Sequence, residues 1–345
     1  MNQPAVALVP WLQSQWTLWT QLTGRLGHAY LLAGPKGIGI ESFVDQAVQK
    51  VLCLQPINGV ACQQCQGCHL YLGKQHPDFY HLRRLDDKKD ISVDQVRTLI
   101  NKLNETSHQG GYKVIWVEGV EFLNQSAFNA LLKTLEEPAT NTLFLLTTHE
   151  IGRLPATIKS RCQLLSFIPP ALADAVTWLH QALPQVDLAL VKRALRLNWG
   201  APLDALEWIE EGKFEEDSRW KEGLKQLQSG HKTVSQVVAE WLKWSTPVSV
   251  FDYFYQWSVS AVRSVSYKVD ESQTWAEATT KEQQLQLQNW LRFQKAILQA
   301  KENWLGNANK ELVLETLCLE WLEVQQIAEP FQSIFQSKLQ KGTLP

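Results

Sequence analysis

Four cysteines lie close together in the first quarter of the chain, in the segment "CLQPINGVACQQCQGC". Their spacing is C-x8-C-x2-C-x2-C. Four thiolates satisfy the tetrahedral coordination of zinc and leave no position open for a reactive water. The spacing therefore predicts a structural zinc site rather than a pair of redox thiols. We expect His69 to be a neighbour of this site, and the predicted ligands are Cys53, Cys62, Cys65 and Cys68.

A glycine-rich stretch, "GPKGIGIES", follows the hydrophobic run "HAYLLA". In the motif G-x-x-x-x-G-K-[ST], backbone N–H groups cradle phosphates, the Lys reaches the outer phosphates and the Ser or Thr binds Mg²⁺. Gly34, Gly37 and Gly39 retain the turn, but Ile40 and Glu41 replace the last two residues of the motif. The motif alone therefore favours a structural loop over hydrolysis, and it leaves passive ATP binding open.

The composition is that of a globular protein with real hydrophobic cores. The chain has 345 residues, 45% of them hydrophobic, which suggests two or three domains. The N-terminus has neither the basic start of a signal peptide nor a hydrophobic run long enough to cross a membrane, so we expect a cytoplasmic location. A formal charge of -2 gives no overall attraction to nucleic acid.

Between residues 28 and 150, short β-rich runs alternate with amphipathic segments. This alternation predicts a parallel sheet with helices on its faces. Ser92 and Gln95 have the spacing of a capping box at the start of a helix, and Pro138 is placed to end a second helix after "SAFNALLKTLEE". After about Arg161 the strand signals stop. The expected strands lie in "HAYLLAG", "DFYHLR", "KVIWVEG" and "TLFLLTTHE".

The rest of the chain has helical periodicity. Three short helices are expected up to about residue 212, with Gly200 placed to end the second, and longer helices after that. Tryptophans are frequent in this region, and filling of the core at helix contacts explains them better than a ligand site. Some of them could also lie at an interface between subunits.

Four segments, in this order, resemble the bacterial clamp-loader subunits of the AAA+ ATPase class. They are "RLGHAYLLAGPKGIG", the cysteine cluster, "FNALLKTLEEP" and "RLPATIKSRCQLLSF". The resemblance covers about the first half of the chain. It implies an α/β AAA+ domain of the P-loop type at residues 1–166, with the zinc module inserted at 53–68. A three-helix lid domain at 167–212 and an all-α collar domain for oligomerisation at 213–345 would follow.

The resemblance also identifies further ATPase positions. The family's Asp-Glu pair, which binds Mg²⁺ and activates water, corresponds to Glu118 and Gly119, and a nucleotide-sensing Arg corresponds to Leu203. Only a strand-end Thr, at 147 or 148, remains as a possible sensor. Together with the altered loop, these changes imply that the chain has no ATPase activity of its own.

One catalytic element of the family remains. Ser160, Arg161 and Cys162 match the SRC motif, whose Arg acts as an arginine finger in the ATP site of a neighbouring subunit. A permanently charged, planar guanidinium suits this task. Without the resemblance, Arg161 would be a surface residue in a turn.

The resemblance implies a non-hydrolysing, stator-like subunit of the DNA polymerase III clamp loader, within the DNA-directed DNA polymerase (nucleotidyltransferase) complex. The implied partners are the ATPase subunits gamma/tau and the subunit delta in a hetero-pentamer, with the sliding clamp and primer-template DNA reached through the complex. Two alternatives are an active clamp-loader-type ATPase and a zinc-dependent nucleic-acid-binding module. The weak basic character near the cysteines argues against the second.

Overall fold

The structure is a computed structural model that describes residues 8–22, 25–85, 88–103, 106–266, 281–306 and 308–325, with residues 333 and 335. The chain divides into two compact units. The first unit runs up to Val191 and includes Gly200–Leu206, and the second contains Lys192–Trp199 and the chain from Glu207 onward. The ends of the predicted first and third domains, at residues 1–7 and from 336 onward, lie outside the described residues.

The first unit is built on a five-stranded sheet with the strand order β2-β3-β4-β1-β5. All neighbouring strands are parallel, and in the central pair Leu31 of β1 lies opposite Leu146 of β4. The hydrophobic runs predicted as strands from the sequence are confirmed as the first four. The strands are β1 (Ala29–Ala33), β2 (Phe79–Leu82), β3 (Lys113–Val117), β4 (Thr142–Thr148) and β5 (Gln163–Ser166).

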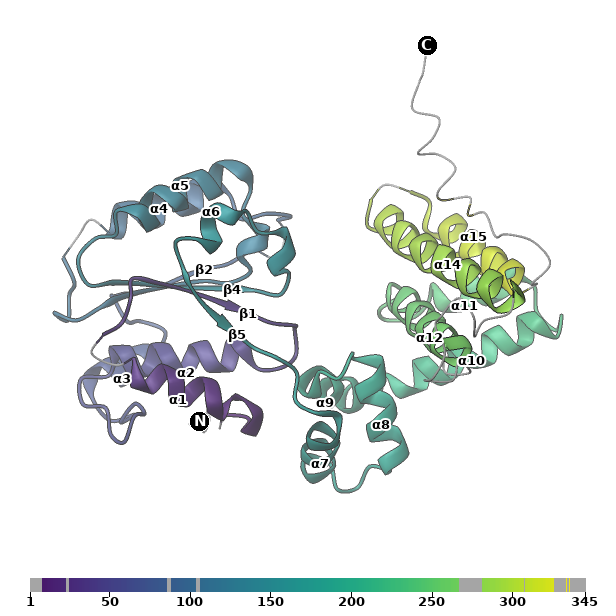
Figure 1. The fold of residues 1–345 in the computed structure, drawn as a ribbon, viewed down its shortest axis with the longest axis horizontal. Helices are drawn as coiled ribbons and strands as arrows, with labels where there is room; N and C mark the ends of the chain where they lie inside the picture. The colour runs from purple at the N-terminus through teal and green to yellow at the C-terminus, as the bar shows by residue number, and fades with distance from the viewer. Residues whose placement is uncertain are drawn as a thin grey trace, which may run out of the picture. The chain divides into compact units, whose positions relative to one another are not determined.

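Both faces of this sheet are covered, as is usual for parallel sheets. Tyr30 and Leu32 of β1 pack into the core on one face, and Ala29 and Leu31 into the core on the other. Figure 1 shows α1, α2 and α3 on one face and α4, α5 and α6 on the opposite face. These helices are α1 (Gln13–Gln21), α2 (Ile40–Leu52), α3 (Gln66–Leu72), α4 (Val93–Leu103), α5 (Gln125–Glu136) and α6 (Ala156–Lys159).

The starts of two helices follow from local capping. The backbone N–H of Ser92 donates to Oε1 of Gln95 at 3.0 Å and the N–H of Gln95 donates to Oγ of Ser92 at 3.4 Å, so the predicted capping box is confirmed. Asn124 caps α5 by accepting a bond from the N–H of Ala127 at 2.9 Å. Helix α5 ends at Glu136, shortly before Pro138 as predicted.

The expectation that strands stop after Arg161 is wrong. Strand β5 follows Arg161 directly and pairs in parallel with β1. Its four residues form a sheet edge and are mostly exposed, so the segment lacks the continuous hydrophobic run of a central strand. Pairing with β1, not local propensity, therefore creates this strand.

Helices follow β5. They begin with α7 (Leu172–Ala182) in the first unit, and the division between the units runs through the next two helices, α8 (Leu188–Leu197) and α9 (Pro202–Glu210). The predicted helical character of this region is confirmed, and Gly200, with φ +80°, follows the end of α8. Its division into a separate lid domain and a collar domain stays a prediction.

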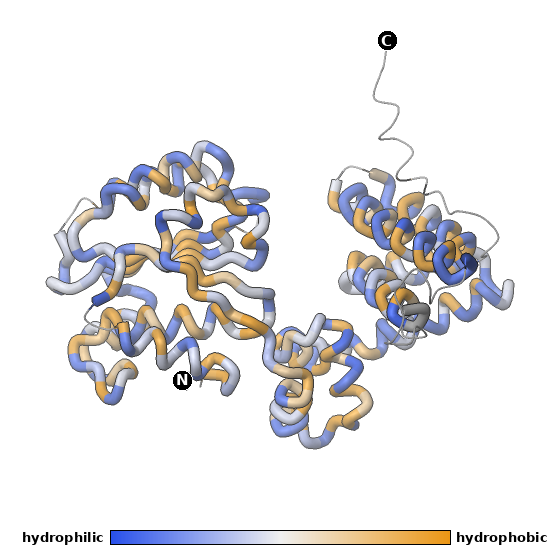
Figure 2. Tube along the Cα trace, viewed as in Figure 1, coloured by the Kyte–Doolittle hydropathy of each residue, from blue (hydrophilic) through white to orange (hydrophobic). Residues whose placement is uncertain are grey.

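The second unit has a helical core of its own. Trp220, Trp241 and Trp321 are buried at its centre, so the interpretation of these tryptophans as core residues is confirmed, whereas Trp199 is exposed. Hydrophobic residues form stripes along these helices and nearly continuous stretches along the strands of the first unit (Figure 2). The further helices are α10 (Phe214–Gln228), α11 (Val234–Trp241), α12 (Ser249–Ser266), α14 (Lys281–Leu305) and α15 (Lys310–Val324).

A buried ion pair joins α8 to α10 inside the second unit. The Asp217 side chain is 3% exposed and accepts a bond from Nε of Arg193 at 2.6 Å, with a second bond from the same guanidinium. Lys221 lies 3.2 Å from the same carboxylate. Among the described residues, we find no helix with the length and hydrophobicity needed to span a membrane.

Candidate functional site

The glycine-rich loop makes a sharp turn from β1 into α2. Gly37 and Gly39 have φ values of +73° and +96°, which non-glycine residues rarely adopt, and Gly39 is the N-cap of α2. Ile40, in the place of the phosphate-binding Lys, is 0% exposed. A Cβ added to Gly34 would lie 3.1 Å from Cδ1 of Ile40. The loop thus makes the sharp strand-to-helix turn expected from its glycines, and the Ile40 side chain packs into the hydrophobic core.

Side chains of the same unit cover the loop. The backbone N–H of Leu203, in the first turn of α9, donates to the Gly37 carbonyl at 3.0 Å. The Asp204 carboxylate packs on Gly37 so closely that an added Cβ would lie 2.3 Å from its Cγ. From the other side, Nε1 of Trp11 donates to the Ile38 carbonyl at 2.9 Å. These contacts place a carboxylate on the turn and engage the backbone carbonyls of Gly37 and Ile38.

Glu41 is held by a histidine at the end of β4. Nε2 of His149 lies 3.0 Å from the Glu41 carboxylate, and Nδ1 lies 3.0 Å from the Gly34 carbonyl. A carbonyl only accepts, so Nδ1 donates, and both bonds are satisfied together by a protonated imidazole. The bond to Glu41 raises the pKa of His149. Burial is the largest single influence on Glu41 and raises its pKa, but the bond from His149, a backbone N–H bond and the nearby charges of His149 and Lys36 together outweigh it, so the pKa of Glu41 is lowered.

Gly119, which stands in the position of the catalytic Glu, has a backbone conformation that disfavours any side chain. Gly119 follows β3 with φ +69°, and a Cβ added there would lie 2.6 Å from the ring of Phe122. The preceding Glu118 turns to His81, with 2.7 Å between its carboxylate and Nε2, and His81 stacks on Trp116. A side chain at position 119 would therefore be strained and would require Phe122 to move, while the carboxylate at 118 is used in a local pair.

The two candidate sensor threonines at the end of β4 are buried and bonded within the sheet region. Oγ1 of Thr147 accepts from the N–H of Gly119 at 3.3 Å, and Oγ1 of Thr148 accepts from the N–H of Glu150 at 3.1 Å. Both residues are at most 1% exposed. Their hydroxyl groups act in these local bonds, which fix the loops after β3 and β4.

The four predicted zinc ligands come together between α2 and α3. The Sγ atoms of Cys53 and Cys65 are 3.9 Å apart, and those of Cys62 and Cys68 are 4.0 Å apart. All four sulfurs lie within 4.8 Å of one another. Zn–S bonds of about 2.3 Å in a tetrahedron place sulfurs roughly 3.8 Å apart, so the donor set fits zinc.

Backbone N–H groups support the thiolates. The N–H groups of Leu54 and Cys68 donate to Sγ of Cys65 at 3.4 and 3.5 Å, and the N–H of Cys62 donates to Sγ of Cys53 at 3.2 Å. Burial raises the pKa of Cys65, but these N–H bonds lower it to about 6. Burial raises the pKa of Cys53 and of Cys68 in the same cluster, and it raises the pKa of Cys162, outside the cluster, to about 11.

Arg161 lies between α6 and β5, with its side chain 32% exposed. Nη1 donates to the carbonyl of Thr157 at 2.9 Å and approaches Oγ of Ser160 at 3.4 Å, while Nη2 pairs with the carboxylate of Glu136 at the end of α5. The half-buried Cys162 packs against the core between the sheet and helices α4, α5 and α6, and anchors the backbone after Arg161. The guanidinium is thus ordered and still reachable by a ligand.

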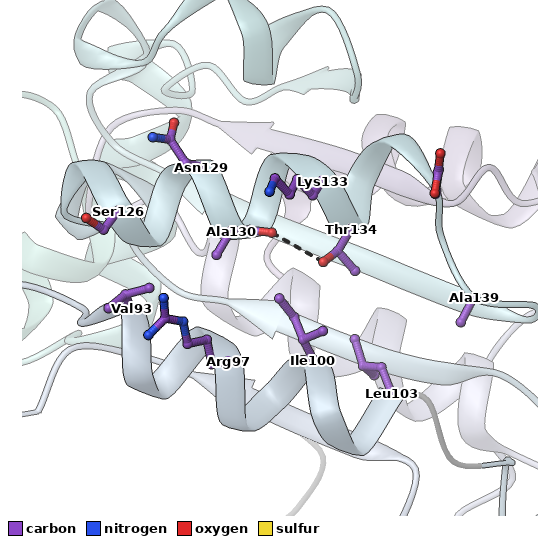
Figure 3. A pocket seen from close by; sticks show the side chains of 11 residues that line it. Val93, Arg97, Ile100, Leu103, Ser126, Asn129, Ala130, Lys133, Thr134 and Ala139 are labelled. Atoms are coloured by element: carbon purple, nitrogen blue, oxygen red, sulfur yellow. Dashed lines mark hydrogen bonds between the residues drawn. The ribbon is translucent and has the colours of Figure 1, made fainter.

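An open groove of about 640 Å³, not predicted from the sequence, lies between α4 and α5 (Figure 3). Arg97 comes from α4 and Lys133 from α5, with Ile100 and Ala130 on the apolar floor. This groove is separate from the glycine-rich loop. Residues of α5 are accessible in this groove. The helix lies on the same face of the sheet as the Glu136–Arg161 pair.

Sequence reasoning missed three side chains of this site: His149, Asp204 and Glu136. His149 and Asp204 were detectable only as polar residues next to positions already compared with ATPases, Thr148 and Leu203. Glu136 lies inside the segment "FNALLKTLEEP", where its partner 25 residues away cannot be deduced from spacing. Contacts made through the folded sheet have no local sequence signal.

Comparison with known proteins gives a consistent assignment. The sequence family described as "DNA polymerase III, delta subunit" matches residues 15–171. The chain is 34% identical to DNA polymerase III subunit delta' of Pseudomonas aeruginosa over 326 residues, which cover 91% of this chain and 97% of that protein. It is 41% identical to the Escherichia coli subunit delta' over 199 residues, 57% of this chain and 59% of that protein.

Two further similarities are more distant. DNA polymerase III subunit tau/gamma of Haemophilus influenzae is 34% identical over 177 residues, 49% of this chain and 25% of that protein. A gamma subunit-related protein of Thermotoga maritima aligns in structure with a TM-score of 0.45 and 18% identity, over 91% of this chain and 99% of that one. The near full-length match to the Pseudomonas protein decides the assignment: the chain belongs to the DNA polymerase III subunit delta' family of clamp-loader proteins.

Proposed function

We propose that this chain is a non-hydrolysing subunit of the clamp loader that supplies Arg161 in trans to the ATP site of a neighbouring subunit. The observation that carries the proposal is the contrast between two sites. At the glycine-rich loop, a fully buried Ile40 stands in the position of the phosphate-binding Lys, and the Asp204 carboxylate packs on Gly37. At the SRC motif, the guanidinium of Arg161 is ordered and accessible.

Loss of hydrolysis has a physical basis at each ATPase position. A buried Ile40 cannot neutralise phosphate charge, Gly119 cannot carry the carboxylate that activates water, and Leu203 packs beside Gly39 with no charge to sense a nucleotide. Phosphoryl transfer depends on these electrostatic contacts, since the protein does little covalent chemistry. An active ATPase, the first alternative, is therefore disfavoured.

The proposed assembly is a cytoplasmic hetero-pentamer with gamma/tau ATPase subunits and delta. In it, the helices of the second unit serve as the collar, and the complex places the sliding clamp on primer-template DNA. Arg161 stabilises the charge that develops on the γ-phosphate at the neighbour's site. The cysteine cluster holds zinc as a structural element, with no catalytic step.

The test is the substitution Arg161→Ala in the reconstituted complex, with ATPase activity measured in the presence of primed DNA and the clamp. Arginine fingers raise turnover about 10³- to 10⁵-fold. The ATP site that receives Arg161 should therefore lose its activity, and the total ATPase rate of the complex should fall by the fraction that this site contributes. Assembly, followed by size-exclusion chromatography, should not change because the side chain is partly exposed.

A matched control is Arg153→Ala. Arg153 is an exposed arginine at the end of a 3-10 helix, Ile151–Arg153, which precedes α6, and it pairs with Glu150 at 3.0 Å. This variant should retain full activity. An Arg161→Ala complex that assembles and hydrolyses ATP at the normal rate would rule out the finger role.

A further inference from the structure

The position of Glu136 is unfavourable for the helix that contains it. Glu136 is the last residue of α5 and Glu137 is its C-cap, so two carboxylates lie where the helix dipole favours cations. A carboxylate at this position destabilises the end of its own helix, so we expect its role to lie outside the helix. Glu136 differs from Glu137 in one recorded contact, the pair with Nη2 of Arg161.

The bonds to Arg161 hold its guanidinium in one orientation. Nη1 is fixed by the carbonyl of Thr157 and Nη2 by the carboxylate of Glu136, so two separate elements, α6 and α5, grip the two terminal nitrogens. A planar group held at two corners cannot rotate about its long axis. Within the described part of the chain, no recorded bond uses Nε, so the edge that contains Nε remains available to an incoming anion.

We propose that Glu136 is a positioning residue, which orients Arg161 so that its Nε edge meets the phosphate of the nucleotide held by the neighbouring subunit. This inference rests on the proposed finger role. The carboxylate fixes the orientation of the Arg161 side chain before the subunits bind one another. The conformational entropy of this side chain is therefore lost when the chain folds and not in the transition state of the reaction.

The experiment uses the reconstituted complex containing Glu136→Gln, Arg161→Ala or both, with Glu137→Gln as the matched control. Gln keeps the size and one hydrogen-bond acceptor but removes the charge. We expect Glu136→Gln to reduce the Arg161-dependent part of the DNA-stimulated ATPase activity about threefold, as suits a partly exposed ion pair. The loss should appear in kcat with little change in KM, because orientation acts in the transition state.

The double variant separates positioning from a general structural role. If Glu136 acts only through Arg161, Glu136→Gln should have no effect once Arg161 is Ala. The thermal midpoint of the isolated chain should not fall, because the substitution removes an unfavourable charge from the end of a helix. Glu137→Gln, in an exposed residue without this pair, should behave as wild type.

Two failures can be distinguished. Normal activity of Arg161→Ala would overturn both the finger role and this inference. Reduced activity of Arg161→Ala, together with either normal kcat in Glu136→Gln or an equal loss from Glu136→Gln in the Arg161→Ala background, would overturn the inference alone.

Discussion

His149 joins three parts of the nucleotide-like site through its two ring nitrogens. It starts from the end of β4, bonds the carbonyl of Gly34 at the beginning of the loop, and pairs with Glu41 in the first turn of α2. In a working phosphate loop this space would be shared with a nucleotide and Mg²⁺. Here the protonated imidazole of His149 provides a positive charge, and this side chain belongs to the folded chain itself.

This pair predicts a pH-dependent stability. The raised pKa of His149 means that its contribution is complete below about pH 6.5 and is lost as pH rises through the folded value. The lowered pKa of Glu41 acts at the acidic end of the range. The contribution of Glu41 to stability is complete above about pH 4.5 and is lost as pH falls through the pKa of the folded state. The free energy of unfolding of the first unit should therefore fall as the solution is made alkaline.

The measurement is chemical denaturation of the chain from about pH 6 to pH 9, a range that spans ordinary and raised histidine pKa values. His149→Gln cannot change its charge and should flatten this part of the pH profile. His180→Gln, an exposed histidine on α7, should leave the profile unchanged. An identical slope in His149→Gln and wild type would contradict the role of the pair.

At the residue scale, sequence was sufficient where types and spacing are local. The four cysteines are close in sequence, and the structure brings them together. Ile40 and Glu41 were identified as departures from a motif, but their actual partners, the hydrophobic core and His149, depend on strands far along the chain. The assignment of Arg161 to a finger came from the resemblance and stays a proposal.

At the element scale, the zinc module between α2 and α3 should depend on its metal. We expect one zinc per chain by elemental analysis, and Cys65→Ser should weaken zinc binding by more than the roughly 10- to 100-fold loss typical of changes to groups that only support ligands. Binding free energy of a structural metal is also folding free energy, so this variant should lower the thermal midpoint of the first unit.

The control for the zinc site is His69→Gln. His69 follows Cys68 directly, but only the four cysteines form the cluster found in the described chain. This variant should keep full zinc occupancy. A metal-free wild-type chain that is folded and has four titratable thiols in the module would contradict the assignment.

The same scale shows what sequence predicts about elements. The central strands β3 and β4 are buried on both faces and have continuous hydrophobic runs, so they were predicted. The capping box before α4 was also predicted, because its residues are three apart. The edge strand β5 was missed since its identity comes from pairing with β1, a partner more than a hundred residues away.

At the scale of the whole molecule, the two units should respond separately to local damage. Arg193→Ala would leave the carboxylate of Asp217 buried, with Lys221 as its ion-pair partner among the residues that the structure describes. Removing one partner of a buried pair costs about 3 to 5 kcal/mol, and the partial exposure of Arg193 places this case near about 3 kcal/mol. We expect this loss of stability in the second unit only.

Limited proteolysis with peptide mapping can assign the change to a unit. Arg193→Ala should speed cleavage within the second unit and leave the first unchanged. The control is Arg196→Ala, an exposed arginine one turn later in α8. Equal effects of both substitutions, or faster cleavage of the first unit, would contradict the separate response.

The carboxylate of Asp204 over Gly37 has a consequence for protein engineering. Restoring Lys at position 40 would place a charge in a fully buried site, and a catalytic Glu at 119 would collide with Phe122. Neither change would remove the Asp204 carboxylate of α9 from its position over Gly37. We therefore expect each single substitution to lower the stability of the first unit while the other departures from an ATPase site remain.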